Sequence, residues 1–217
     1  MTTFPNSPQL LKGGLVLIDP QTAMVQRIIA LQYNPDSLSR SFQIKGVGTE
    51  GGDRSEALRL KGPPVETIKV EAELDATDQL EFADAKATAV GIHPQLAALE
   101  MIVYPTSGQL LANHRLAQAG KLEIAPMETP LMLFVWSKMR VVPVRLTEFS
   151  VTEEAFDPVL NPIRAKVSLG MRVLTVDDVG FGHKAGTLFM SYLQVKEQLA
   201  AQNQGGSLNV LGIGAIP

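Results

Sequence analysis

The segment MRVVPVRLTEFSVTEEAFDPVLNPIRAKVSLGMRVL, residues 139–174, decides the fold of this chain. In its second half, apolar residues alternate with polar or small ones over eleven positions. Alternation with a period of two is typical of a strand with one buried face. Residues 163–173 are therefore predicted to form one long strand. Its buried side is formed by Ile163, Ala165, Val167, Leu169, Met171 and Val173.

The first half of this segment is predicted to be the partner strand, and its alternation changes parity. Apolar residues stand at even positions up to Leu146 and at odd positions from Phe149 onward. One extra residue in a strand, a β-bulge, produces this change, and we place it near Thr147 and Glu148. An eleven-residue loop, 152–162, is expected to join the two arms. Hairpins of this length are typical of curved sheets, barrels or assemblies in which neighbouring chains cover the second face.

Composition and charge exclude several classes of function. The chain has 217 residues, a net charge of −3 and no cysteine. Nucleic acid is not expected as a partner because phosphate binding requires a basic surface, and without thiols there are no disulfides or thiol chemistry. The longest apolar run, 131–136, is too short for a membrane span of about 20 residues, and no secretory signal is recognised. We therefore expect a soluble protein that stays in a reducing cytoplasm, without membrane insertion.

The remainder of the chain is predicted to be mainly β, with about eight strands in all and two or three helices. We divide it into an N-terminal arm (1–14), a β domain with a C-terminal helix (15–203) and a flexible apolar tail (204–217). A long loop spans 46–64, and residues 110–124 are ambiguous. The other strands are expected at 15–19, 25–33, 39–44, 66–74 and 130–136, and the helices after 75–78, from Pro94 with a buried face that includes Met101 and Val103, and at 184–202.

No motif in the sequence predicts a cofactor, metal or catalytic site, and an enzyme is not expected. Residues 46–51 match GxGxxG, but no helix is predicted after the third glycine, so the match is interpreted as a loop. The histidines are scattered and none has a second ligand at helical spacing. They are His93, His114 and His183.

Acidic residues crowd the loop of the hairpin, at Glu153, Glu154 and Asp157. Paired carboxylates serve acid–base chemistry or bind Ca²⁺ in other proteins. We favour a simpler interpretation, in which Thr152 caps a single helical turn and the acids complement its dipole.

Charged residues on the polar side of the hairpin allow two interpretations. The favoured one is pairing across strands of the same sheet, worth about 0.2–1 kcal/mol for each pair. The alternative is that they steer a neighbouring copy into register, because complementary charge contributes specificity more than affinity. The residues concerned are Arg145, Arg164, Lys166 and Arg172, with Glu71 and Glu73 on another strand.

Together, several of these stretches resemble the tube-type proteins of contractile injection systems, which are relatives of contractile phage tails. The resemblance covers about residues 15–178 and is most specific in the hairpin loop. It implies an α+β, mainly β fold, with two β-sheets rolled into a barrel or sandwich, a long hairpin and one or two flanking helices. It is carried by PLMLFVW (130–136), VRLT (144–147), TEEAFDP (152–158) and LNPIRAK (160–166), with YNP (33–35) and LDAT (74–77) earlier in the chain.

The resemblance implies a structural assembly protein of a phage-tail-like particle. Six copies would form a ring that initiates the inner tube or adapts it to the spike and baseplate, so the expected partners are further copies and the tube, spike and baseplate proteins. Many such adaptors carry a LysM module, and no LysM-like repeat follows Asp178 in this sequence. Subunit contacts are expected at Tyr33, Asn34, Pro35, Glu153, Glu154, Phe156, Asp157, Asn161 and Arg164.

A small-ligand-binding β-barrel module is the alternative function. In that case the loop 46–64 would cover a small molecule. A chain that stays monomeric at high concentration, and whose filled pocket protects it from proteolysis, would favour this alternative.

Overall fold

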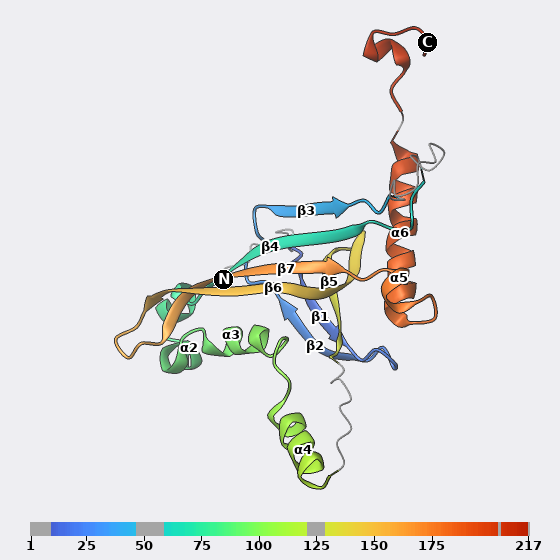
Figure 1. Cartoon of the computed structure of the whole chain (residues 1–217). Helices are drawn as coiled ribbons and strands as arrows, with labels where there is room; N and C mark the ends of the chain where they lie inside the picture. Colours follow the sequence, from blue (N-terminus) through green and yellow to red (C-terminus); the bar gives the residue numbers. More distant parts are fainter. Residues whose placement is uncertain (1–9, 47–58, 121–128, 204, 217) are drawn as a thin grey trace.

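A computed structural model describes residues 10–46, 59–120, 129–203 and 205–216 of the chain. Its centre is one antiparallel sheet of seven strands in the order β2-β1-β5-β6-β7-β4-β3 (Figure 1). This architecture confirms the predicted mainly β, α+β class. The strands are β1 Gly14–Ile18, β2 Val25–Ala30, β3 Leu38–Gln43, β4 Val65–Asp75, β5 Leu131–Ser137, β6 Arg140–Phe156 and β7 Pro162–Val173.

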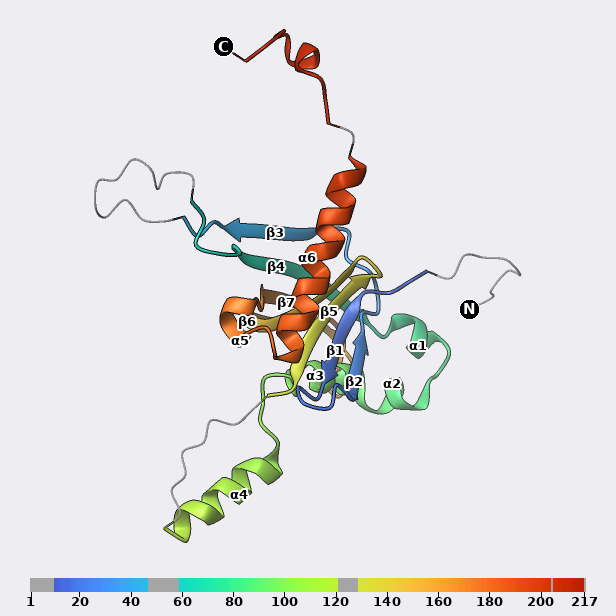
Figure 2. The ribbon, with the colours of Figure 1, turned by 90° about the vertical axis from the view of Figure 1, so that its right-hand side faces the viewer.

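The sheet is strongly curved and remains open. The resemblance implied two sheets, whereas the described strands form a single sheet. In Figure 2 its strands β1, β2 and β5 run steeply across β3 and β4. In the described part of the chain, β2 pairs only with β1 and β3 pairs only with β4. The sheet therefore ends in two unpaired edges.

The hairpin of β6 and β7 confirms the predicted alternation and bulge. The pairing register shifts between Leu146 and Glu148, and the apolar side of β7 is almost fully buried. The predicted eleven-residue loop is wrong, because both strands continue and leave only residues 157–161 between them. The helical turn capped by Thr152 is wrong for the same reason. Thr152 pairs with Lys166 and Glu154 with Arg164, so strand pairing extends nearly to the tip.

The core lies on the concave side of the sheet. Apolar residues of β4 and β7, such as Ile68, Val70 and Met171, are less than 5% exposed and pack with Leu96 of α3 and Phe189 of α6. Figures 1 and 2 place α3 at one end of this side and α6 at the other. The opposite side of β4, β6 and β7 carries the polar and charged residues.

The described residues contain six α-helices, more than the two or three expected. The C-terminal helix has the predicted bounds, whereas the segment after residue 75 forms two short helices. The ambiguous segment contains α4, which buries no residue. None of the described helices is long and apolar enough to cross a membrane. The helices are α1 Thr77–Glu81, α2 Ala85–Val90, α3 His93–Glu100, α4 Ser107–Gln118, α5 Val176–Val179 and α6 Lys184–Gln202, with a 3₁₀ helix at Leu208–Leu211.

The structure corrects one further prediction, the buried face of α3, and another prediction falls on residues that it does not describe. Helix α3 ends at Glu100, so Met101 and Val103 do not belong to its buried face and are 41% and 47% exposed. Most of the loop 46–64, with the GxGxxG match, lies outside the described residues. Within this loop, the described residues Gly46 and Leu60 are joined by an isolated β-bridge.

Candidate functional site

The hairpin tip is built by its own polar side chains. Asp157 Oδ1 accepts hydrogen bonds from the backbone N–H groups of Val159 (2.9 Å) and Asn161 (2.8 Å), and Oδ2 accepts from Asn161 Nδ2 (2.8 Å). Desolvation acts to raise the pKa of Asp157, but the hydrogen bonds from Asn161 and Val159 outweigh it and lower this pKa. Both side chains therefore fix the turn.

The root of the tip is anchored to the helices that follow β4. Asn161 Nδ2 donates to the carbonyl of Ala89 (3.2 Å), and the Ile92 N–H donates to the carbonyl of Pro162 (2.9 Å). Gly91 lies directly against this carbonyl, in a conformation with φ 56° that favours glycine. One side of the hairpin thus rests on α2 and α3, and the other side faces outward.

Exposed apolar residues occupy the outermost positions of the tip. Val159 is 74% exposed and Leu160 is 77% exposed, while Phe156 is also exposed. Leu160 has a left-handed backbone conformation with φ 69°, which costs an L-residue about 1–2 kcal/mol. Sequence reasoning missed Val159 and Leu160, although an apolar pair between Asp-Pro and Asn-Pro was visible. A strained apolar residue on the surface points to function rather than folding.

Replacing Leu160 by asparagine is expected to separate stability from assembly. Asparagine tolerates the left-handed region, so the free energy of unfolding should stay equal or rise by up to about 1 kcal/mol. If the tip binds another subunit, assembly should weaken at the same time. Chemical denaturation measures the first quantity and electron microscopy of assembled particles the second. The matched control is Ala83→Asn, because Ala83 also has a positive φ, 51°, and lies between α1 and α2. Unfolding of Leu160→Asn at clearly lower denaturant would contradict the strain argument.

A second group of predicted residues follows β2. Asn34 accepts a hydrogen bond from the Gly13 N–H (2.9 Å) and donates to the Leu11 carbonyl (2.8 Å). The neighbouring Gln32 binds both backbone groups of Asp75, at 2.6 Å and 3.0 Å. This turn is thereby tied to the end of β4.

Asp75 extends this connection to the hairpin. Its carboxylate accepts a hydrogen bond from Arg164 Nε at 2.9 Å. Burial raises the pKa of Asp75, but hydrogen bonds from Thr77 and the charge of Arg164 lower it overall. Hydrogen bonds through Asp75 and Gln32 therefore link Arg164 to the turn of residues 33–35.

The nine predicted contact residues thus form two groups. Phe156, Asp157 and Asn161 lie at the tip, with Glu153 and Glu154 on the strand that leads to it, and Arg164 with residues 33–35 lies at the junction with β4. The two groups adjoin, because Glu154 lies directly opposite Arg164. A shallow cleft of about 490 Å³ beside residues 33–37 is also lined by Glu71 and Glu73. That these two groups contact other subunits stays a prediction.

Most charges on the polar side of the sheet pair within the chain. Lys69 binds Glu148 at 3.0 Å, and Lys166 lies 3.8 Å from Glu154. Arg172 binds Asp178 at 2.6 Å. The first two pairs join strands of one sheet, as the favoured interpretation expects, whereas Asp178 belongs to α5. That interpretation is therefore confirmed only in part. In the described part of the chain, Glu71 and Glu73 form no ion pair.

The unpaired strand edges expose apolar residues. On β2, Val25 is 57% and Ile28 is 68% exposed. On and after β3, Phe42 and Ile44 are exposed as well. Unpaired backbone N–H and C=O groups on an edge strand are a template for pairing with another chain. The two edges are therefore candidate interfaces, which the sequence patterns of β2 and β3 alone did not reveal.

A buried ion cluster connects α6 to the sheet and was missed by sequence reasoning. Glu66 is 4% exposed, and its carboxylate binds Arg40 Nη2 at 2.7 Å and Lys196 Nζ at 2.9 Å. Tyr192 donates its hydroxyl to the same carboxylate at 3.0 Å. Burial, followed by the Glu66 charge, raises the pKa of Tyr192 to about 12. The sequence did contain one sign of this burial: Glu66 stands two residues before Ile68 and therefore lies on the same, buried face of the strand.

The surface features of the tip and of the sheet edges suit binding between proteins. Among the described residues, no group of three or more histidine, aspartate or glutamate side chains is placed to hold a metal ion. The features that remain are the apolar tip, the open edges and their flanking charges.

Comparison with known proteins gives one family. The family model described as contractile injection system tube protein matches residues 17–177. No curated protein matches the chain in sequence. Two solved structures overlap with it, the virion of a native gene transfer agent particle (TM-score 0.29) and the tail of an empty gene transfer agent particle (TM-score 0.30). Each is 12% identical and covers 74% of this chain and 90% of its own.

Proposed function

Because this chain belongs to the contractile injection system tube protein family, with a structural role in a phage-tail-like particle, we propose that it forms a ring of six copies. The ring initiates the inner tube or adapts it to the spike and baseplate. Its partners are further copies of the chain and the tube, spike and baseplate proteins, and it assembles in the bacterial cytoplasm. Residues 15–203 form the ring-building domain.

The open curved sheet is the observation that carries this proposal. Within the described ranges it ends in two unpaired edges, β2 and β3, at opposite ends of the strand order. If β2 of one copy pairs with β3 of the next, each copy uses two different surfaces, and head-to-tail contacts of this kind close into a ring when the rotation permits. Pairing would also bury Ile28 and Phe42, which the isolated chain exposes.

The hairpin tip serves the contacts outside the ring in this proposal. Phe156, Val159 and Leu160 provide an apolar surface, and Glu153 adds charge beside it. Anchoring on α2 and α3 keeps the tip in a fixed position, so that little conformational entropy is lost when a partner binds. Residues 33–35 and Arg164 form a second contact surface with Glu71 and Glu73.

Replacing Ile28 by lysine is expected to abolish ring formation without unfolding the chain. A lysine on an edge strand prevents pairing with another edge, while substitution of an exposed residue changes the free energy of unfolding by less than about 0.5 kcal/mol. Sedimentation and negative-stain electron microscopy would measure the assembly. The matched control is Met139→Lys, since Met139 is similarly exposed, at 57%, but lies in the turn between β5 and β6. Rings formed by Ile28→Lys would contradict pairing through β2.

The role in the particle is tested by removing the chain from producing cells. Electron microscopy should then find particles without properly initiated inner tubes, and supplying the chain in trans should restore them. Normal tubes in its absence would overturn the proposed function.

A further inference from the structure

The C-terminal segment of the chain is an apolar, uncharged element held clear of the body. Residues 205–216 contain no ionisable side chain. They include a short 3₁₀ helix, Leu208–Leu211, followed by a turn at Gly212 with φ 74°. Figures 1 and 2 show this segment beyond the end of α6, away from the sheet. Its exposed apolar residues are Leu208, Val210, Leu211, Ile213 and Ile216.

Helix α6, which precedes this segment, is attached to the sheet at two places. The ion cluster of Glu66 binds Tyr192 near the middle of the helix and Lys196 in its second half, and so fixes the helix to β3 and β4. Its first half packs on the core through Phe189. The helix has 19 residues, which corresponds to a length of about 28 Å at 1.5 Å per residue.

An open apolar cleft lies at the opposite end of the same helix. It has a volume of about 740 Å³ and lies between the β1–β2 turn, the segment after α3 and the start of β5. His183 belongs to its lining and is also the N-cap residue of α6. Only Arg145 and His183 can carry charge among the described lining residues. Its apolar lining includes Met101, Ile102, Val103, Leu131, Met132 and Leu174.

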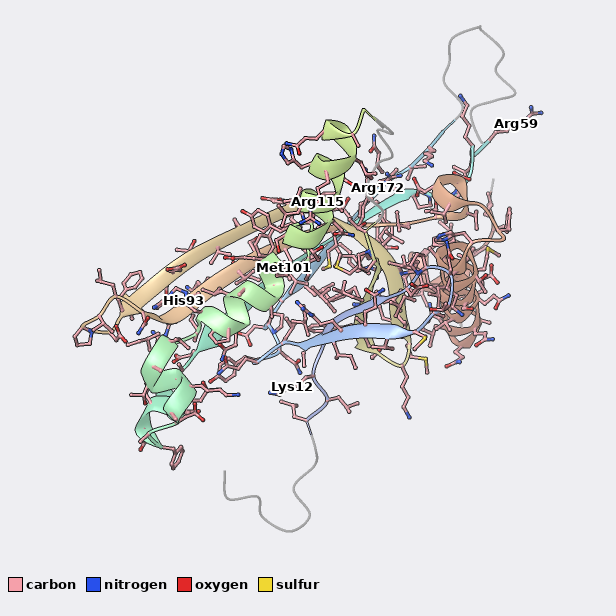
Figure 3. The ribbon with its side chains drawn as sticks, turned by 90° about the horizontal axis from the view of Figure 1, so that it is seen from below. Lys12, Arg59, His93, Met101, Arg115 and Arg172 are labelled. Atoms are coloured by element: carbon pink, nitrogen blue, oxygen red, sulfur yellow. The ribbon has the colours of Figure 1, made fainter. Side chains whose placement is uncertain are left out.

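We propose that the tail of one copy, residues 208–216, binds in this cleft of a second copy. This inference rests on the proposed ring-forming function and names a further contact through which copies associate. The tail is uncharged and the cleft is mostly apolar, so burial of apolar surface drives the contact. Met101 and Val103 line the cleft and stay exposed in the single chain, and the bound tail covers them. Figure 3 labels Met101, which directly follows α3.

The placement of the two surfaces favours a second copy over the same chain. The cleft adjoins the first residue of α6 and the tail begins after its last, so the length of the helix separates them. To reach its own cleft, the tail would have to run back along the whole helix with its 3₁₀ turn unwound. Donor and acceptor at opposite ends give a head-to-tail contact, which builds rings or stacks of copies.

Two full-length variants with complementary defects test this contact. The first blocks the tail with Val210→Asp and Leu211→Asp, and the second blocks the cleft with Met101→Glu and Val103→Glu. Both also carry Ile28→Lys, so that pairing through β2 does not contribute. Each variant alone should sediment as a monomer, whereas a mixture should form a one-to-one dimer from the intact tail of one and the intact cleft of the other.

The outcomes distinguish this contact from the ring itself. A mixture that stays monomeric overturns the tail contact, but leaves the ring proposal standing if Ile28→Lys alone abolishes rings. Dimers in the mixture support the contact even if the unmodified chain forms no rings, in which case the proposed function fails. In the control, the second variant carries Phe82→Glu in place of its two cleft substitutions, because Phe82 is exposed and lies between α1 and α2, away from the cleft lining. The intact cleft of this control should bind the tail of another copy at least about tenfold more tightly than the cleft that carries Met101→Glu and Val103→Glu.

Discussion

Replacing Glu66 by alanine is expected to lower the free energy of unfolding by about 3 kcal/mol. The substitution leaves the cations of Arg40 and Lys196 without their shared carboxylate and the Tyr192 hydroxyl without its acceptor. Breaking a buried ion pair costs about 3–5 kcal/mol, and the lower end applies because both cations keep partial access to water. We expect α6 to detach from β3 and β4.

The matched control for this prediction is Glu71→Ala on the same strand. Glu71 is exposed and forms no ion pair within the described residues, so its loss should change the free energy of unfolding by less than about 0.5 kcal/mol. Chemical denaturation compares the two variants. The tyrosinate absorbance provides an independent measurement, because the raised pKa of Tyr192 should fall when the Glu66 charge is removed. Equal stability of the two variants would show that the cluster contributes nothing to the attachment of α6.

Replacing Gly91 by alanine is expected to destabilise the chain by about 4 kcal/mol or more. Gly91 has φ 56° and ψ −136°, a conformation that only glycine adopts easily, and strain of this kind costs about 1–3 kcal/mol. A Cβ atom at this position would also lie less than 3.0 Å from the carbonyl oxygen of Pro162. Because that carbonyl accepts the hydrogen bond from Ile92, the clash would open the contact between the hairpin and the helices.

Gly180→Ala separates the clash from the backbone strain. Gly180 has φ 75° and ψ 167°, which is also unfavourable for alanine, but no atom of the described residues lies within 4 Å of a Cβ placed there. Its substitution should therefore cost only the strain of about 1–3 kcal/mol. Thermal unfolding would compare the two variants, and proteolysis would report whether the tip loosens in Gly91→Ala. If Gly91→Ala were no less stable than Gly180→Ala, the hairpin would not depend on this contact.

The candidate interface was predictable from the sequence only in part. The hairpin, its bulge and the acidic residues near its end were visible because they follow one another along the chain. The exposure of Val159 and Leu160 was not visible, because two consecutive apolar residues are equally compatible with burial in the core. The open edges β2 and β3 likewise depend on which strands pair, and these partners are far apart in the sequence.

Local periodicity by itself determined the long alternating strands, the bulge near Glu148 and the bounds of α6. Burial of one face imposes a repeat of apolar residues on a segment, and that repeat is visible in residues that follow one another in the sequence. Only the tertiary structure decided how far the strands pair, since Glu154 continues β6 by lying opposite Arg164 of β7. It also decided the burial of Glu66, whose charged partners Arg40 and Lys196 stand 26 and 130 residues away. A sequence pattern reports what one segment needs to bury, whereas the residues that cover or neutralise it come from distant segments that only folding brings together.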